Sequence, residues 1–416
     1  MVANMVGTGA FTTLGLQLNF LQSGWAILGL WLLGGLLTLF GAFSYAELAV
    51  RLPPLWGRSP LFGGDFPSLA WFLSGWISLT VGFAAAVALA AMAVGKYLSA
   101  YTTWPAWLTG VLSIVLLSLA HSLSVHYSSR LQNALTVLKL LFIIGLVAAG
   151  LWLPAVADPL TDWSAQGLQQ SWSPQAAVAL ISIFYAYSGW NAAAYIVEEI
   201  EAPARHLPRA LIFGSLVVSL LFILLQYSFL RQAGGAALQG QIEVGQIAAV
   251  AMFGPSTGKL ISAMIGVLLL AGISAMIWVG PRVVMAMGDR HNLWRFYGKL
   301  EANGMPLRAI WLQAGISVFL VLTASFERVL LYSGLVLQFF TFLTVLGLLK
   351  VRRAQPIAAW RSPLYPIAQW LFLGFSAWSM VYSLISFPLE SLLGLLNVGA
   401  GLIAYSLDPA GLKAAD

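Results

Sequence analysis

Apolar runs of about 20 residues recur along the whole chain, with only short connections between them. A helix of that length crosses roughly 30 Å of hydrocarbon, since it rises about 1.5 Å per residue. Only 8% of the 416 residues are charged, which is too few to cover a soluble domain of this size. We therefore predict an all-α polytopic membrane protein with a single membrane domain over 1–416. Twelve helices are expected, at about 1–20, 25–50, 67–100, 106–124, 131–153, 174–197, 208–231, 256–287, 308–325, 328–349, 366–386 and 389–407.

Lys and Arg are distributed unevenly over the connections between these segments. With twelve crossings, fifteen of the 20 basic residues fall on the same side as the amino terminus. The other side receives only Lys96, Arg231, Lys259 and Arg328, and Lys139 lies within a helix. Because basic residues are retained in the cytoplasm, both termini are predicted to be cytoplasmic in a multi-pass protein of the cell membrane. The net charge of +6 then indicates contact with anionic lipid rather than with nucleic acid.

Several classes of protein are disfavoured by what the sequence lacks. There is no cysteine, and no GxSxG, HExxH or P-loop motif, so we expect neither an enzyme nor an ATP-driven pump. The four histidines fall in predicted cytoplasmic loops without metal-ligand spacing, and we expect no metal or cofactor. An ion channel is also disfavoured, because the sequence contains no filter-like loop and no ring of acidic residues. The first residues show no cleavable signal peptide, and the connection at 232–255 is expected to carry a helix along the outer surface.

Two predicted helices are interrupted in their apolar interior. The first break is Gly7-Thr8-Gly9 and the second is Ser188-Gly189 within a polar and aromatic stretch. Glycine permits unwinding, and an unwound helix at membrane depth exposes backbone amides and carbonyls to a ligand. Either glycine motif alone more often serves close helix packing. The breaks lie in segments one and six, however, which are equivalent if segments 1–5 and 6–10 are inverted repeats, and such pairs mark transporter sites.

The residues around these breaks resemble a known family. GTGAF in segment one, SYAELAVRLP in segment two, TVLKLLF in segment five, FYAYSGWNAAAYIVEEIEAPARHLPRAL in segment six and SAMIWVGPRVVMAM in segment eight resemble the amino acid–polyamine–organocation superfamily. The resemblance implies a LeuT-type fold. Its two inverted five-helix repeats would occupy 1–153 and 174–350, followed by two peripheral helices within 366–407.

The resemblance also implies an amino acid substrate and residues that bind it. The carboxylate would meet backbone amides at the first break, and the ammonium would meet carbonyls near Met5, Tyr185 and Ser188. Aromatic and amide side chains of the sixth segment would surround the substrate's own side chain. The predicted binding residues are Met5, Gly7, Thr8, Gly9, Ala10, Tyr185, Tyr187, Ser188, Gly189, Trp190 and Asn191.

Lys139 lies near the middle of its predicted membrane segment, where a charge costs roughly 2.5–3.5 kcal/mol to insert. It could snorkel to the cytoplasmic surface. In sodium-independent members of the superfamily, a lysine at this point is similarly placed where sodium sits in sodium-coupled relatives. The resemblance therefore implies that its ammonium bonds carbonyls of helix one and a hydroxyl of helix eight, Ser274. A lysine in so dry a site could also carry protons.

Charged residues at the inner helix ends are candidates for a gate. Glu198 and Glu199 follow the sixth segment and face Arg205 and Arg209 across the next loop, although such runs are as often a solvated helix end. Glu47, near the inner end of helix two, is expected to pair with a basic loop residue.

Two features depart from the superfamily pattern. Only about six residues precede the first break, so either the start is assigned late or the inner gate is unusual. PPLWGRSPLF stands where a glycine-glycine-glutamate run is usual, which affects the expected gate more than the substrate site.

The sequence thus predicts a secondary active amino acid transporter that works by alternating access. We expect independence from sodium, with proton coupling or exchange, and neutral substrates, because no acidic residue lies at membrane depth to bind a cationic side chain. The alternatives are a non-transporting amino acid sensor and an exporter or antiporter of the same fold. The oligomeric state is not predicted.

Overall fold

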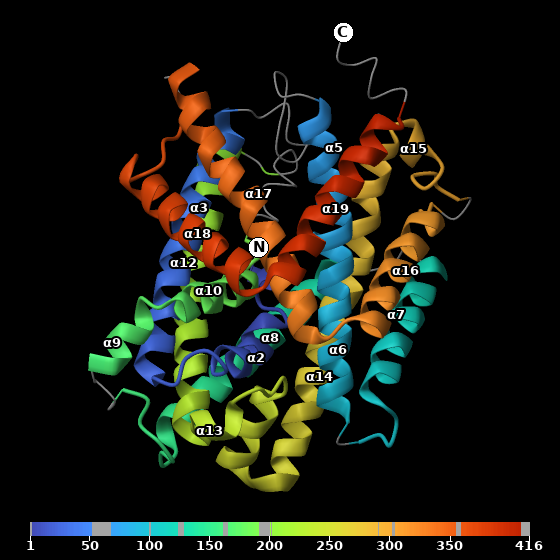
Figure 1. The fold of residues 1–416 in the computed structure, drawn as a ribbon. Helices are drawn as coiled ribbons and strands as arrows, with labels where there is room; N and C mark the ends of the chain where they lie inside the picture. The colour runs from blue at the N-terminus through green and yellow to red at the C-terminus, as the bar shows by residue number, and fades with distance from the viewer. Residues whose placement is uncertain are drawn as a thin grey trace.

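A computed structural model describes residues 2–51, 68–99, 101–123, 129–160, 165–190, 200, 202–289, 291–301, 304–354 and 359–408. Within these ranges every regular element is a helix, as Figure 1 shows. The helices stand in one bundle, with α15 at one end and α13 at the other. The amino terminus lies near the middle of the bundle rather than at either end.

The bounds of the elements follow the predicted segments closely. The first half of the chain contains α1 (Val2–Met5), α2 (Gly9–Gln17), α3 (Gly24–Arg51), α5 (Ser68–Ile77), η1 (Ser78–Ala85), α6 (Ala86–Leu98), α7 (Ala106–Leu123), α8 (Ser129–Trp152) and α9 (Ala165–Ser171). The second half contains α10 (Pro174–Tyr187), α12 (Pro203–Ala233), α13 (Gly235–Leu238), α14 (Val244–Gly288), α15 (Asn292–Arg295), α16 (Leu307–Thr323), α17 (Phe326–Ala354), α18 (Ile367–Ser386) and α19 (Pro388–Ser406).

The helices are long and apolar enough for a membrane protein. Among the described residues, eight helices meet the length and hydropathy of a membrane span, and three shorter apolar helices cover 136–152, 174–187 and 307–323. With the broken pair α1 and α2 they account for all twelve predicted segments. The prediction of an all-α polytopic membrane fold is confirmed.

Two helices differ in shape from the simple spans that were expected. The third segment is not one α-helix, because eight of its residues form the wider turns of a π-helix, η1, between α5 and α6. In α14, Gly254 has φ +80°, which separates a first helix ending at Phe253 from the long span that begins at Pro255. The helix expected in the outer connection is therefore the first part of α14.

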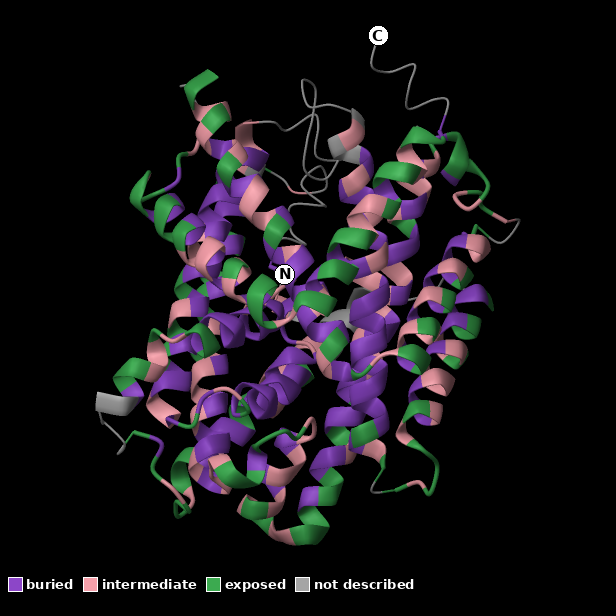
Figure 2. Ribbon diagram, viewed as in Figure 1, coloured by how far each residue is buried: buried purple, intermediate pink, exposed green. Residues whose placement is uncertain are grey.

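Helix α2 lies at the centre of the bundle, and all nine of its residues are buried. Figure 2 shows buried residues filling the middle of the molecule and exposed ones on the outer faces of the peripheral helices. Polar side chains from three other helices hold α2. Trp31 Nε1 donates to Gln17 Oε1 at 2.8 Å, and Tyr97 Oη and Gln226 Nε2 donate to the carbonyls of Phe11 and Ala10 at 2.6 and 3.0 Å. These bonds fix the position of the first break.

Candidate functional site

The two predicted helix breaks lie against each other. A Cβ on Gly9 would fall only 2.4 Å from the Cα of Ala186, so α2 and α10 touch backbone to backbone there. On the other side of the contact, a Cβ on Gly189 would fall 2.8 Å from the carbonyl oxygen of Asn4. Gly189 also has φ +93°, a conformation that glycine adopts without strain. Residues about 180 positions apart thus form one composite site.

The helix ends at this contact carry opposite partial charges. Helix α2 begins at Gly9, and its N-cap residue Thr8 makes no side-chain cap bond, so the first amides of α2 are available. Helix α10 ends at Tyr187, where the N–H of the C-cap residue Ser188 donates to the carbonyl of Tyr185 at 3.0 Å and the last carbonyls form the carboxyl end of the helix. An anionic group is favoured at the start of α2 and a cationic group at the end of α10. The arrangement therefore suits a small molecule that carries both charges.

A cavity of about 350 Å³ opens beside the breaks. None of the described residues that line it is Asp, Glu, Lys, Arg or His. The predicted binding residues that do line it are Met5, Gly7, Thr8, Gly9, Tyr185, Ser188, Gly189 and Trp190. Asn191 lies outside the described residues. The cavity presents backbone dipoles and neutral side chains to whatever it holds.

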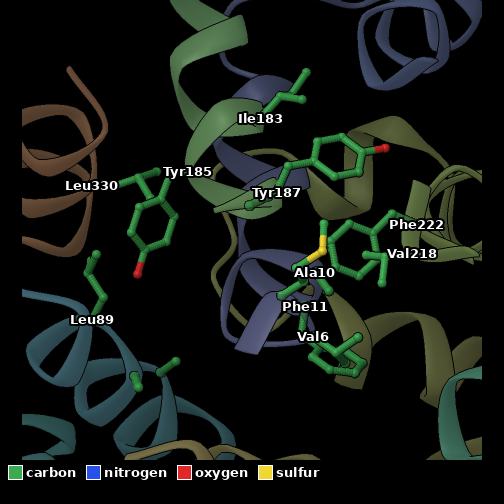
Figure 3. Close-up of a cluster of buried hydrophobic side chains, with 14 of the residues drawn as sticks. Val6, Ala10, Phe11, Leu89, Ile183, Tyr185, Tyr187, Val218, Phe222 and Leu330 are labelled. Carbon is green, nitrogen blue, oxygen red and sulfur yellow. The ribbon is translucent and has the colours of Figure 1, made fainter. Parts of the chain in front are cut away.

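Two of the predicted binding residues, Tyr187 and Ala10, do not line the cavity. Tyr187 points away from the cavity, packs on Trp31 and Phe222, and donates from its hydroxyl to the carbonyl of Trp31 at 3.0 Å. Figure 3 shows Tyr185 and Tyr187 directed to different sides of α10. Residues two positions apart in an α-helix point in directions that differ by about 200°, so these tyrosines cannot share a face. Ala10 is buried in the core below the break and does not line the cavity.

Several helices that the sequence did not assign to the site also line the cavity. The walls include polar side chains of α3, α5, η1 and α17 and apolar ones of α14 and α18. Together with further residues of α1 and α10, the lining residues that were not predicted are Asn4, Thr38, Tyr45, Ser74, Ile77, Ser78, Gly82, Phe83, Ala86, Phe184, Ala186, Ala275, Met276, Val279, Gly334, Leu337, Gln338, Phe340, Thr341 and Phe372. Polar residues repeated at helical spacing, such as Ser74 with Ser78 and Gln338 with Thr341, were a usable signal.

Lys139 lies beside the first break, as expected, but not against Ser274. Its Nζ donates to the carbonyl of Val6 at 2.8 Å, and the side chain is buried on α8. The Ser274 hydroxyl instead bonds Nε2 of His121 at 2.8 Å. His121 was expected in a loop, but it is buried in the last turn of α7 and contacts Ser274 of α14. The predicted bond between Lys139 and Ser274 is therefore wrong.

The candidate gate is described only in part. Glu198 and Glu199 lie outside the described residues, whereas Arg205 and Arg209 are exposed near the start of α12. Glu47 does pair with basic residues: its buried carboxylate accepts from Arg51 Nε at 2.8 Å and from Arg352 Nη1 at 3.3 Å. This cluster ties the last turns of α3 and α17 together.

Comparison with known proteins decides the family. Residues 1–392 match the family model described as amino acid permease. The chain belongs to the amino acid permease family. The resemblance to the amino acid–polyamine–organocation superfamily seen in the sequence is thereby confirmed, and with it the LeuT-type fold.

The relatives of this permease are amino acid transporters from bacteria and mammals. It is 25% identical to the serine/threonine exchanger SteT of Bacillus subtilis, over 97% of this chain and 93% of the relative. It is 25% identical to the large neutral amino acids transporter small subunit 2 of Homo sapiens, over 98% and 78% of the two chains. The Asc-type amino acid transporter 1 of Mus musculus is 23% identical, over 98% and 79%.

Proposed function

We propose that this permease is a secondary active transporter that moves neutral amino acids across the cytoplasmic membrane by alternating access. One observation carries the proposal: the start of α2 and the end of α10 meet at a cavity whose described lining is uncharged. An amino acid zwitterion matches that pair of helix ends, and its side chain needs no counter-charge from the walls.

In the proposed complex the substrate's carboxylate accepts from the amides of Thr8 and Gly9, which line the cavity. Its ammonium donates to carbonyls at the ends of α1 and α10, near Met5 and Tyr185. Backbone groups would thus hold the part that all α-amino acids share, and the remaining walls would select the side chain. The names of the relatives, which include a serine/threonine exchanger and a large neutral amino acids transporter, support a neutral substrate.

The position of Lys139 supports the proposal that transport does not need sodium. Its ammonium bonds the carbonyl of Val6 at the first break, where a backbone oxygen would otherwise be free to bind a cation. We propose that Lys139 supplies the positive charge permanently or exchanges a proton during the cycle. Proton coupling and exchange of internal for external amino acid are both compatible with this arrangement.

We propose that two inverted repeats, over 1–153 and 174–350, rock against each other around the site, with the helices of 366–407 outside them. Glu198 and Glu199 with Arg205 and Arg209 would form and break inner gate contacts during this motion. The excess of basic residues on one side supports cytoplasmic termini.

The direct test is uptake of labelled amino acids into proteoliposomes, with a panel of neutral, cationic and anionic substrates. We expect accumulation of neutral ones when a pH gradient or internal amino acid is supplied, and no response to sodium. Binding without flux across sealed vesicles would instead indicate a sensor. Accumulation driven by sodium alone would contradict the role of Lys139.

A matched pair of variants separates that role from general stability. Lys139→Ala is expected to lower sodium-independent uptake at least about tenfold, because the carbonyl of Val6 loses its charged donor. Lys96→Ala, which removes an exposed lysine at the far end of α6, serves as the control and should leave uptake unchanged. Wild-type uptake in Lys139→Ala would refute both the structural and the proton-carrying role.

A further inference from the structure

Asn397 is an amide side chain in the middle of α19, the last membrane helix. Each polar group in lipid must find a partner within the protein, so such a residue usually has a function. Its Oδ1 accepts from Trp76 Nε1 at 2.6 Å, and its Nδ2 donates to Thr80 Oγ1 at 3.1 Å and to the hydroxyl of Tyr332. One side chain on a helix expected to be peripheral thus bonds α5, η1 and α17.

Helix α19 approaches these neighbours closely on the same face. A Cβ on Gly401 would lie 2.9 Å from Trp76, and one on Gly394 would lie 3.0 Å from Val336 of α17. Gly394 and Gly401 are three residues before and four residues after Asn397, so all three share one helical face. Small residues flanking a hydrogen-bonding one are the usual means of packing membrane helices tightly. The contact is therefore a specific junction between three helices.

The groups that Asn397 bonds lie directly behind the cavity wall. Trp76 precedes Ile77 and Ser78, and Thr80 precedes Gly82 and Phe83; these four following residues line the cavity. On the other side Tyr332 lies two residues before the lining residue Gly334 and five before Leu337. Ile77 and Val81 pack on Val336 and Phe340 between the two sets. Any shift of the Asn397 junction would move this wall.

The wall at this point is a π-helix, which is less regular than an α-helix and often occurs at functional sites. Where α5 passes into η1, the hydroxyl of Thr80 donates to the carbonyl of Trp76 at 2.9 Å while accepting from Asn397. The amide of Asn397 thereby bonds one residue on each side of the boundary between α5 and η1.

We propose that Asn397 is a positioning residue for the substrate cavity: by bonding Trp76, Thr80 and Tyr332 it sets how far η1 stands from the α2–α10 breaks, and so which neutral side chains fit. This inference rests on the proposed transport of amino acids. It makes α19 part of the substrate-selecting structure, although the helix lies outside both proposed repeats.

The test compares Asn397→Leu with Leu396→Ala, which alters an exposed side chain of the same helix. Uptake of a small and a large neutral amino acid is measured at equal amounts of reconstituted protein. We expect Asn397→Leu to change the ratio of the two KM values about tenfold with a smaller change in maximal rate, and Tyr332→Phe and Thr80→Val to produce part of that shift. Leu396→Ala should keep the wild-type ratio. An unchanged ratio in Asn397→Leu, with any loss confined to the amount of folded protein, would overturn the proposal.

A second measurement does not depend on transport. The chain has no cysteine, so Ser78→Cys and Ala275→Cys each give one thiol, on η1 and on the wall formed by α14. Asn397→Leu is expected to change the alkylation rate of the thiol at position 78 and not that at 275. If wild-type protein transports no amino acid, the proposed function fails, and this pair of rates still decides whether Asn397 positions the wall. Equal rates at position 78 in both backgrounds would refute it.

Discussion

Gly9 and Gly7 lie two residues apart in the first break, yet they differ in the space around them. A Cβ on Gly9 would meet the backbone of Ala186 at 2.4 Å, whereas one on Gly7 would meet only carbonyl oxygens at 3.9 and 4.0 Å. Gly9→Ala must therefore separate α2 from α10, and we expect at least a tenfold loss of uptake at equal protein amounts.

The matched variants make this test specific. Gly7→Ala should lose less uptake than Gly9→Ala, and Gly29→Ala, whose Cβ would meet nothing within 4 Å, should lose none. If Gly7→Ala and Gly9→Ala were equally impaired, the contact with Ala186 would not be the reason that glycine is needed.

Gly82 offers a substitution that narrows the cavity without strain. It lines the cavity from η1, and a Cβ there would meet only the carbonyl oxygen of Ile77, at 3.9 Å. One methyl group in a pocket discriminates by roughly 10- to 200-fold. We expect Gly82→Ala to raise the KM of large neutral amino acids by roughly 10- to 200-fold and to leave the KM of the smallest neutral amino acid unchanged. Gly272→Ala, outside the cavity and also without a neighbour within 4 Å, should change neither KM.

Single residues show where sequence reasoning about the site succeeded and where it could not. The glycines of both breaks were recognisable because glycine and polar residues are costly in the middle of an apolar helix. The orientation of Tyr187 was not, because it depends on where α10 stops being helical. For Lys139, the bond to a carbonyl of the first helix was predicted correctly. The bond to Ser274 was not, since the Ser274 hydroxyl is hydrogen-bonded to His121 of α7.

At the scale of elements, length and hydropathy were sufficient to predict the spans but not their faces. A helix that is apolar all round has no preferred face in its sequence, so the apolar lining residues of α14, which are Ala275, Met276 and Val279, could not be assigned. The π-helix η1 was also invisible, because its sequence SLTVGFAA contains nothing that disfavours an ordinary α-helix strongly. Both features depend on contacts between helices.

The buried cluster around Glu47 gives a prediction about how elements are held together. Its carboxylate bonds Arg51, Arg352 and the backbone N–H of Ser362 at 2.8 Å, which joins α3, α17 and the segment before α18. Glu47→Gln removes the negative charge beside two guanidinium groups, and breaking a buried pair costs about 3–5 kcal/mol. We expect a clear fall in the thermal unfolding temperature of the detergent-solubilised protein.

The exposed pair of Glu301 and Arg308 supplies the control for this experiment. Their charged atoms are 3.7 Å apart and both side chains are more than a third exposed, so the pair contributes less than about 1 kcal/mol. Glu301→Gln should leave the unfolding temperature almost unchanged. An equal effect of the two substitutions would show that the Glu47 cluster is not a stabilising contact.

For the whole molecule, the sequence predicted the family, the helical membrane fold and the two interrupted helices. These follow from composition and from motifs that stand at fixed spacing, and both are local properties of the chain. The cavity did not follow, because six or more helices contribute its walls and their relative rotation is set by packing. The junction at Asn397 belongs to the same class, since its three partners lie about 65 to 320 positions away.

The orientation of the molecule in the membrane is the last whole-chain property that the sequence predicts. Gln239 follows α13 at one end of the bundle, and Asn292 begins α15 at the other (Figure 1). Both side chains are exposed, and the natural absence of cysteine makes each single-cysteine variant unambiguous. We expect a membrane-impermeant thiol reagent on intact cells to label Gln239→Cys and not Asn292→Cys, and to label both after the cells are opened. The opposite pattern would place fifteen of the 20 basic residues outside, contrary to the rule that basic loops stay in the cytoplasm, and would require the inner gate to be sought at the α13 end.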